Sequence, residues 1–281
     1  MNIQWYPGHM TDARRKMTEE IRQVDLVIEL LDARIPLSGK NPDIDRMAKD
    51  KKRLLILNKC DLADPELTKL WRNEFEKQGF SVIEMDGRVP KEARFVTKAA
   101  EELAKEKRER DMRRGIQPRP IKAMVVGIPN VGKSTFINSY VGKASAKTGN
   151  KPGVTKGSQW IRISNSIRLL DTPGILWPKF EDPAAGEKIA YIGSINDAIL
   201  DLTELSVSLL QYLQKYYCNL LNDRYKIEKS DEPYAALLKI AECKKCIKTG
   251  GEPDPDRAAK LFLDDVRSAR LGRVTFDRPA E

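Results

Sequence analysis

Short apolar runs alternate with amphipathic stretches along the first two thirds of the chain. Runs rich in Val, Ile and Leu, of the kind that forms buried strands, occupy residues 25–32, 53–57, 81–85, 122–127, 160–163 and 167–171. Helical spacing of apolar residues occurs between them, at 65–78, 91–113 and 134–140. This alternation predicts an α/β fold with a mostly parallel sheet, in which the last two runs form an antiparallel hairpin at the edge.

The pattern changes near residue 177. Beyond it, helical periodicity occupies residues 184–191, 197–217, 233–248 and 256–271, with Pro and Gly at several of the breaks. We therefore expect an α/β domain over residues 1–177, followed by an all-α C-terminal domain over residues 178–281.

A Gly-rich segment, GIPNVGKS at residues 127–134, follows one apolar run and precedes a helical one. This is the context of a phosphate-binding loop, whose backbone N–H groups and following helix N-terminus surround nucleotide phosphates. Lys133 is expected to reach the β- and γ-phosphates, and the Ser134 hydroxyl to bind Mg²⁺. A similar Gly-rich turn also arises by chance, so the assignment depends on the motifs that follow. The loop residues expected to contact nucleotide are Asn130, Val131, Gly132, Lys133, Ser134 and Thr135.

A second motif, DTPG at residues 171–174, follows the apolar run 167–170. Asp171 can hold Mg²⁺ through water, and the Gly174 N–H can meet a γ-phosphate. Thr155 lies between the two motifs and is expected to bind Mg²⁺ when the γ-phosphate is present. The alternative for Thr155 is an ordinary loop residue.

The base is read by NKCD at residues 58–61, after the apolar run 53–57. The Asp61 carboxylate can accept two hydrogen bonds from guanine that adenine cannot offer. Asn58 is expected to tie this loop to the phosphate loop, and the stem of Lys59 to lie over the base. Backbone N–H groups at Asp86 and Gly87 are expected to complete the guanine site, which makes GTP the predicted substrate.

The order of these motifs is unusual, because the base-reading loop precedes the phosphate loop. This is a circular permutation of the common GTPase order. Together with WYPGHM at residues 5–10 and DARIP at residues 32–36, it resembles the ribosome biogenesis GTPase A family over the whole chain. The resemblance implies a bacterial GTPase that acts late in assembly of the large ribosomal subunit, with ribosomal RNA and ribosomal proteins as partners.

The chain has one histidine, His9, and the resemblance implies that it organises the attacking water. Ile175 stands where Ras-type enzymes carry a water-orienting glutamine, and an aliphatic side chain cannot do this. A neutral imidazole suits the task. The alternative is that His9 caps the following helix or packs beside Trp5.

The resemblance also singles out Asn130, since an asparagine at this loop position is associated with K⁺-stimulated GTPases. K⁺ there would supply positive charge beside the phosphates. The alternative is a side chain that hydrogen-bonds its own turn.

Charge divides unevenly along the chain, which has 50 Lys and Arg against 41 Asp and Glu, a net +9. Up to residue 177 there are 34 basic and 23 acidic residues, a balance of +11; the remainder has 16 and 18, a balance of −2. Basic residues concentrate at 105–122 and 143–156, which favours contact with RNA phosphates, although such runs are often solvated helix faces. Arg257, Lys260, Arg267 and Arg270 have spacings that can place them on one helix face.

No apolar run is long enough for a membrane helix, and the N-terminus has no signal pattern. A cytoplasmic protein without a membrane partner, monomeric off the ribosome, is therefore expected. Cys243 and Cys246 form a lone pair without further ligands, which favours an incidental pair over a zinc site.

These observations predict a GTPase that docks on the large subunit with GTP and is released after ribosome-stimulated hydrolysis. Two alternatives stay open: an RNA-binding scaffold in which hydrolysis is incidental, and an assembly GTPase of the small subunit.

Overall fold

The computed structural model describes residues 8–117, 119–141, 158–177, 180 and 182–279, and the side chains of these residues from Met10 onward. A six-stranded sheet has the order β3-β2-β1-β4-β6-β5. All neighbouring strands are parallel except β5 and β6. The strands are β1 (Leu26–Asp32), β2 (Lys52–Asn58), β3 (Ser81–Met85), β4 (Ile121–Val126), β5 (Gln159–Arg162) and β6 (Ile167–Asp171). The predicted mixed sheet with an antiparallel edge hairpin is confirmed.

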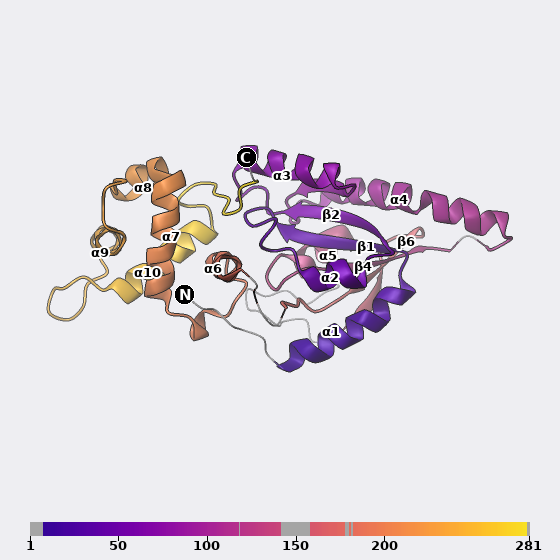
Figure 1. Cartoon of the computed structure of the whole chain (residues 1–281), viewed down its shortest axis with the longest axis horizontal. Coiled ribbons are helices and arrows are strands. Elements are labelled where there is room, and N and C mark those ends of the chain that lie inside the picture. Colours follow the sequence, from indigo (N-terminus) through magenta and orange to yellow (C-terminus); the bar gives the residue numbers. More distant parts are fainter. Residues whose placement is uncertain (1–7, 118, 142–157, 178–179, 181, 280–281) are drawn as a thin grey trace.

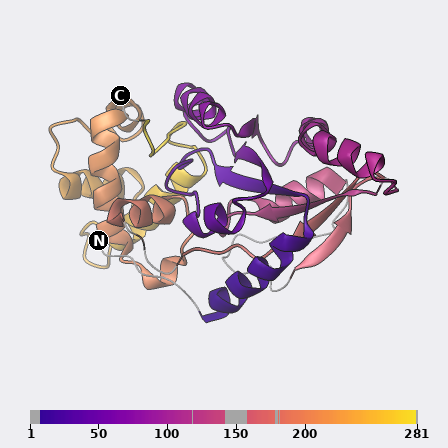
Figure 2. The same cartoon turned by 45° about the vertical axis from the view of Figure 1, so that its right-hand side comes forward.

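Helices cover both faces of the sheet because alternate strand residues point to opposite sides. On one face, Val27 packs in a cluster with Met17 of helix α1 (Gly8–Glu20) and Ile44 of helix α2 (Pro42–Met47). On the other face, the neighbouring Ile28 lies in the cluster that includes Val96 of helix α4 (Ala93–Arg113) and residues of α5 (Lys133–Val141). Figure 2 shows the indigo helix α1 and the magenta helix α4 on opposite sides of the strands.

The third helix of the α/β part, α3 (Pro65–Lys77), has a clear start and a clear apolar face. The Asp64 carboxylate accepts hydrogen bonds from the N–H groups of Glu66 and Leu67, and Pro65 occupies the first turn. Trp71 and Phe75 bury this helix against the end of the sheet. Helix α3 thus covers the β1, β2 and β3 side of the sheet.

Five helices form a second group beside one end of the sheet, α6 being nearest to it (Figure 1). Each of α6, α7, α9 and α10 begins with an acidic side chain that accepts from its first turn. The five are α6 (Pro183–Tyr191), α7 (Leu202–Tyr216), α8 (Cys218–Tyr225), α9 (Pro233–Cys243) and α10 (Pro255–Arg267). We call residues 182–279 the helical segment. It lies within the predicted all-α region, residues 178–281.

Several helix bounds differ from the sequence-based prediction. The helix expected over 197–217 is wrong, because residues 197–199 form a short 3-10 turn and Asp201, with ψ 102, caps a new helix. The helix expected over 233–248 ends at Cys243, since Lys245 adopts a left-handed φ of 54. Helix α2 and helix α8 were not predicted; both are short, and periodicity needs more residues to be visible.

After α10 the chain returns to the α/β part. The buried Asp277 carboxylate accepts hydrogen bonds from the Ser38 N–H at 2.7 Å and from the Ser38 hydroxyl at 2.6 Å. The Trp71 indole N–H donates to the Asp277 carbonyl at 3.1 Å, and the Phe276 N–H to the Arg34 carbonyl at 2.7 Å. The end of the helical segment is therefore packed on the β1 and α3 side of the sheet. Within the described residues, no helix is long and apolar enough to cross a membrane.

Candidate nucleotide-binding site

All of the predicted motif loops within the described residues lie at one edge of the sheet. They follow the carboxyl ends of parallel strands: Asp32 ends β1, Asn58 ends β2, Asp86 follows β3, the phosphate loop follows β4, and Asp171 ends β6. In open α/β sheets this edge is where ligands bind. Residues 100 positions apart in sequence thus converge on one site.

The phosphate loop has the backbone that its sequence demands. Gly132 has a φ of +102, and a Cβ atom added to it would lie 2.5 Å from the Asn58 Nδ2 atom. Asn130 also adopts a positive φ of 57. Glycine at position 132 therefore lets the base-reading loop approach the phosphate loop closely. Val131 is buried and Thr135 is exposed in the first turn of α5.

Lys133 begins helix α5 and points into the loop. Its Nζ atom donates to the Gly127 carbonyl at 3.1 Å and to the Ile128 carbonyl at 3.0 Å. Burial lowers the pKa of the Lys133 ammonium to about 8, against the opposing effect of the Asp171 charge. The ammonium is thus held inside the loop by carbonyl groups, close to where phosphates would meet the backbone N–H groups.

Asp171 is a buried carboxylate at the end of β6, and the Gln159 side chain and the Thr172 N–H group stabilise its charged form only weakly against burial. Both carboxylate oxygens are buried and accept no hydrogen bond of ordinary geometry among the described residues. Burial raises the pKa of Asp171, while the Lys133 charge works in the other direction. An unsatisfied pair of oxygens beside the phosphate loop fits the needs of a hard cation such as Mg²⁺. The neighbouring Thr172 hydroxyl donates to the Val125 carbonyl at 2.7 Å, which fixes the strand end.

The switch turn after Asp171 lies directly on the phosphate loop. A Cβ atom added to Gly174 would stand 2.8 Å from both the Lys133 Nζ and the Pro129 Cα atoms. Only glycine allows this approach, which brings the Gly174 backbone against the phosphate loop; its contact with a γ-phosphate stays a prediction. Ile175 is fully buried, and its carbonyl accepts from Asn41 Nδ2 at 3.3 Å.

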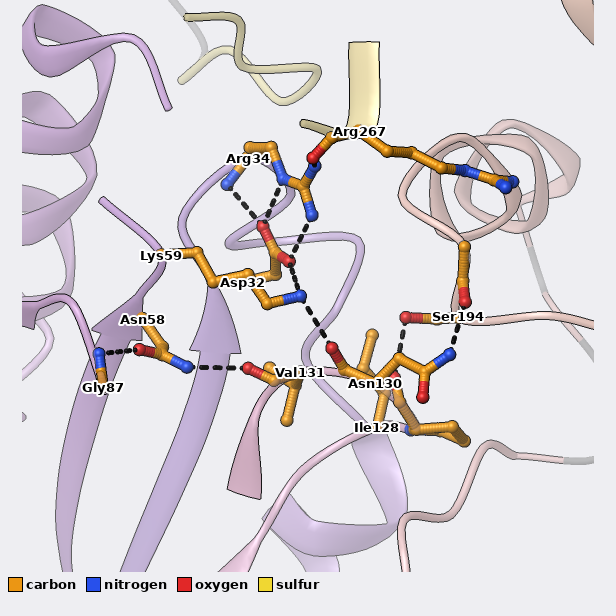
Figure 3. Close-up of polar contacts among 12 residues, drawn as sticks. Asp32, Arg34, Asn58, Lys59, Gly87, Ile128, Asn130, Val131, Ser194 and Arg267 are labelled. Carbon is orange, nitrogen blue, oxygen red and sulfur yellow. Dashed lines mark hydrogen bonds and ion pairs between the residues drawn. The ribbon is translucent and has the colours of Figure 1, made fainter. Parts of the chain in front are cut away.

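Asn58 joins three loops (Figure 3). Its Nδ2 atom donates to the Val131 carbonyl at 2.8 Å, and its Oδ1 atom accepts from the Gly87 N–H at 2.8 Å. The predicted tie between the base-reading and phosphate loops is therefore present in the structure. A single buried amide therefore connects the base-reading loop to the phosphate loop and to the loop that contains Gly87.

Lys59 crosses from the base-reading loop to the phosphate loop. It adopts a left-handed φ of 60, and its Nζ atom donates to the Asn130 carbonyl at 2.6 Å and pairs with Asp32 at 3.1 Å. Burial lowers the pKa of Lys59, and the Asp32 carboxylate counteracts this. Burial acts to raise the pKa of Asp32, but Arg34 and Lys59 together hold it well below its usual range.

Asp61, the predicted guanine acceptor, has one oxygen engaged and one available. Its Oδ2 atom accepts from Arg88 Nη2 at 2.6 Å, while its buried Oδ1 has no hydrogen-bond partner among the described residues. Arg88 also pairs with Asp86 at 2.7 Å, so it links both guanine-site carboxylates. No role for Arg88 is predicted from the sequence, because an exposed arginine in a loop belongs to no recognisable pattern.

Two contacts tie the phosphate loop to the helical segment. Asn130 Nδ2 donates to the Gly193 carbonyl at 2.7 Å, and the Ser194 hydroxyl donates to the Pro129 carbonyl at 2.7 Å. Figure 3 shows Asn130 and Ser194 facing one another across this boundary. The amide of Asn130 is thus part of an interdomain contact, and its association with K⁺ stays a prediction.

Two predicted site residues cannot be placed. Thr155 lies outside the described residues, and of His9 only the backbone is described, in the first turn of α1. Their roles stay predictions. The Cys243 side chain is exposed and Cys246 is buried.

A phosphate loop, a buried unpaired carboxylate and an Asn-Lys-x-Asp loop meet at one sheet edge in permuted chain order. This arrangement defines a circularly permuted P-loop GTPase. By full-length similarity the chain belongs to the ribosome biogenesis GTPase A family. It is therefore a GTP-hydrolysing enzyme of ribosome assembly.

Two relatives match this chain over its whole length. Ribosome biogenesis GTPase A of Bacillus cereus is 44% identical over 282 residues, covering 100% of this chain and 95% of the relative. The Priestia megaterium protein of the same name is also 44% identical and is covered to 98%. A family profile described as "50S ribosome-binding GTPase" matches residues 122–239. The solved structure of GNP-bound YlqF from Thermotoga maritima has 28% identity and a TM-score of 0.65, covering 96% of this chain and 99% of that one.

Proposed function

We propose that this GTPase assists late assembly of the large ribosomal subunit, docking with GTP bound and leaving after hydrolysis. The observation that carries the proposal is the direct bonding of the phosphate loop to the helical segment, through Asn130–Gly193 and Ser194–Pro129. A loop that changes its contacts with the γ-phosphate can then alter the placement of a whole domain. The profile description "50S ribosome-binding GTPase" favours the large subunit as the partner.

The proposed chemistry is water attack on the γ-phosphate of GTP. Ser134, Thr155 and Asp171, the last through water, would hold Mg²⁺, which neutralises charge on the phosphates. Lys133 binds the phosphates, Gly174 contributes its N–H group, and His9 orients the water. K⁺ beside Asn130 would add positive charge in the transition state. Asn58, Lys59, Asp61, Asp86 and Gly87 hold guanine.

Ribosomal RNA is the proposed partner of a basic row on the sheet, at the starts of β4 and β6 and the end of the antiparallel β5, away from the nucleotide edge. Lys122, Arg168 and Arg162 are neighbours across β4, β6 and β5, and none has an ion pair among the described residues. Trp160 is 44% exposed, and the Lys122 Nζ atom lies 5.7 Å from its ring centroid. Unpaired cations beside an exposed aromatic ring suit phosphate contact combined with base stacking.

Nucleotide-dependent docking tests the proposal. Purified large or small subunits are sedimented with the protein carrying either GDP or a non-hydrolysable GTP analogue. We expect co-sedimentation with large subunits that is at least about tenfold stronger with the analogue, a coupling within the usual range. The double variant Arg162→Glu/Arg168→Glu should lose binding, whereas Lys69→Glu on α3 should not. Equal binding with both nucleotides would favour the scaffold, and preference for small subunits would identify the other alternative.

A further inference from the structure

Two arginines outside the nucleotide-binding motifs connect the base-reading loop with the helical segment. Arg34 is 2% exposed, and its side chain makes a forked contact with the fully buried Asp32, with Nε to Oδ1 and Nη2 to Oδ2 both at 2.8 Å. Its remaining nitrogen, Nη1, donates to the Arg267 carbonyl at 3.1 Å. Figure 3 shows Arg34 between Asp32 and Arg267. Each of the three guanidinium nitrogens of Arg34 therefore donates a hydrogen bond. A buried arginine bonded in this way holds its partners in a fixed geometry.

Arg267 makes a second clamp within the helical segment. Its Nε and Nη2 atoms donate to the Tyr191 and Ala190 carbonyls at 2.9 and 2.8 Å, and its guanidinium pairs with Asp197 at 2.7 Å. These carbonyls close helix α6, where the last carbonyl groups have no partner within the helix. The Arg267 carbonyl likewise lies at the end of α10, where it has no partner within the helix, and it accepts a hydrogen bond from Arg34. Each arginine thus caps a helix C-terminus, where positive charge is favourable.

These hydrogen bonds and ion pairs form a closed ring of contacts, called the circuit below, that runs through the helical segment, the phosphate loop and the base-reading loop. Helix α6 leads into Gly193, whose carbonyl accepts from Asn130 of the phosphate loop at 2.7 Å. The Asn130 carbonyl accepts from Lys59 of the base-reading loop at 2.6 Å, and Lys59 pairs with Asp32, which returns to Arg34 and Arg267. The Arg267 side chain also lies over Gly193, since a Cβ atom added there would be 3.3 Å from the Arg267 Nε atom.

We propose that Arg34 and Arg267 are positioning residues of the guanine-nucleotide site, which hold the base-reading and phosphate loops in register through the docked helical segment. This inference rests on the proposed assignment of the guanine site. Nucleotide affinity then depends on docking of the segment. By reciprocity, bound nucleotide stabilises the docked segment to the same extent.

The residue pattern around the circuit supports this role over a purely structural one. Arg270, three residues further along the chain, pairs with Asp265, which also binds Arg224 and Lys244 within the helical segment. Among the residues that the structure describes, that cluster makes no hydrogen bond or ion pair with a motif loop. Arg267 has the opposite arrangement. Its carbonyl is bonded to Arg34, which binds Asp32 beside the base-reading loop, and its guanidinium is bonded to the end of α6, which precedes the Gly193 contact with the phosphate loop. Arg270 therefore provides a matched control.

The test measures the dissociation rate of a fluorescent GDP from Arg267→Ala, Arg34→Lys and the control Arg270→Ala. We expect dissociation to be about tenfold faster in the first two variants, near the lower end of ordinary coupling between sites. Arg270→Ala should match the wild type. If Arg267→Ala does not fold, Arg267→Lys tests the same point, since a lysine keeps the charge and loses the fork.

A combined variant separates positioning from loss of stability. If both arginines act through one circuit, Arg34→Lys/Arg267→Lys should dissociate GDP no faster than the more affected single variant. Independent destabilisation would instead give multiplied effects. Dissociation rates equal to that of Arg270→Ala would overturn the inference while leaving the guanine site intact. Failure of the wild type to bind GDP would overturn the proposed site itself.

Discussion

The two sides of the nucleotide site are built differently. On the base side, Asn58 is buried, Lys59 is half-buried, and their polar atoms are paired with neighbouring loops. On the phosphate side, the buried Asp171 oxygens accept no hydrogen bond of ordinary geometry from the described residues, and Lys133 is held by loop carbonyls. On the base side the loops are therefore preformed and one Asp61 oxygen is left without a partner among the described residues, whereas on the phosphate side both Asp171 oxygens are left, a charge that Mg²⁺ and phosphates are suited to balance.

The difference indicates that recognition of the base and the response to the phosphates are carried by separate parts of the site. A rigid base side selects guanine without rearrangement, because its groups already have their geometry. A phosphate side with buried charge responds strongly to the ligand, which is what a switch requires. Four predictions test this contrast.

The largest effect is expected on the base side, at Asp61. In Asp61→Asn an amide replaces the acceptor of two guanine hydrogen bonds, so GDP affinity should fall on the order of 100-fold or more. A xanthine nucleotide, which offers a carbonyl instead of the amino group, should recover much of the affinity. Nucleotide titration measures both values. Cys60→Ser in the same loop is the control, and unchanged GDP affinity in Asp61→Asn would contradict a preformed guanine site.

The next effect concerns protonation of Lys133 on the phosphate side. Because burial lowers the pKa of Lys133 to about 8, the ammonium is charged below that pH and loses its proton above it. Phosphates favour the charged form, so the Kd for GDP should be flat near neutral pH and rise up to about tenfold per pH unit above 8. Guanosine, which has the same base without phosphates, should show no such rise between pH 7 and 8.8. A parallel rise for guanosine would assign the effect to the base side.

Gly132 lies where the two sides meet. In Gly132→Ala the added Cβ would stand 2.5 Å from the Asn58 Nδ2 atom at a backbone φ of +102, so we expect a loss of about 1–3 kcal/mol in the free energy of unfolding and weaker GDP binding. Gly79→Ala has a similar φ of +87 with no atom within 4 Å, and it isolates backbone strain from the clash. Equal GDP affinity in the two variants would show that close approach of the loops is not needed.

The smallest effect is expected in the stability of the protein free of nucleotide and Mg²⁺. Since the folded state raises the pKa of Asp171 above 3.8, the folded protein keeps this proton to higher pH than the unfolded chain. Ionisation therefore destabilises the fold as pH rises above that value, and Asp171→Asn should raise the unfolding temperature at pH 7 by about 2–4 °C. The variant should also lose stabilisation by Mg²⁺ with GTP. A lower unfolding temperature would mean that the carboxylate is satisfied in the fold.

Much of this site could be predicted from sequence because its motifs are local. Residues 127–134 and 58–61 each combine a strand, a turn and fixed side-chain types, and the structure places both loops at the predicted sheet edge. The strand bounds agree to within one or two residues, since apolar runs of this length have few alternatives.

The rest depends on contacts between distant residues, which a single sequence does not reveal. Arg267 belongs to a spacing that suggested a basic helix face, yet its guanidinium binds the end of α6 and its carbonyl binds Arg34, 233 positions away. The break before α7 depends on one capping residue, Asp201, and not on any loss of apolar periodicity. The features that could not be predicted from the sequence thus depend on long-range contacts and on single capping residues.

We propose that the large ribosomal subunit activates this GTPase. The most direct measurement is GTP turnover in KCl, with and without purified large subunits, for the intact protein and for His9→Ala. The account predicts strong stimulation of the intact protein that is lost in His9→Ala while GTP affinity is kept. Turnover unchanged by large subunits would contradict the account, although the nucleotide site would stand.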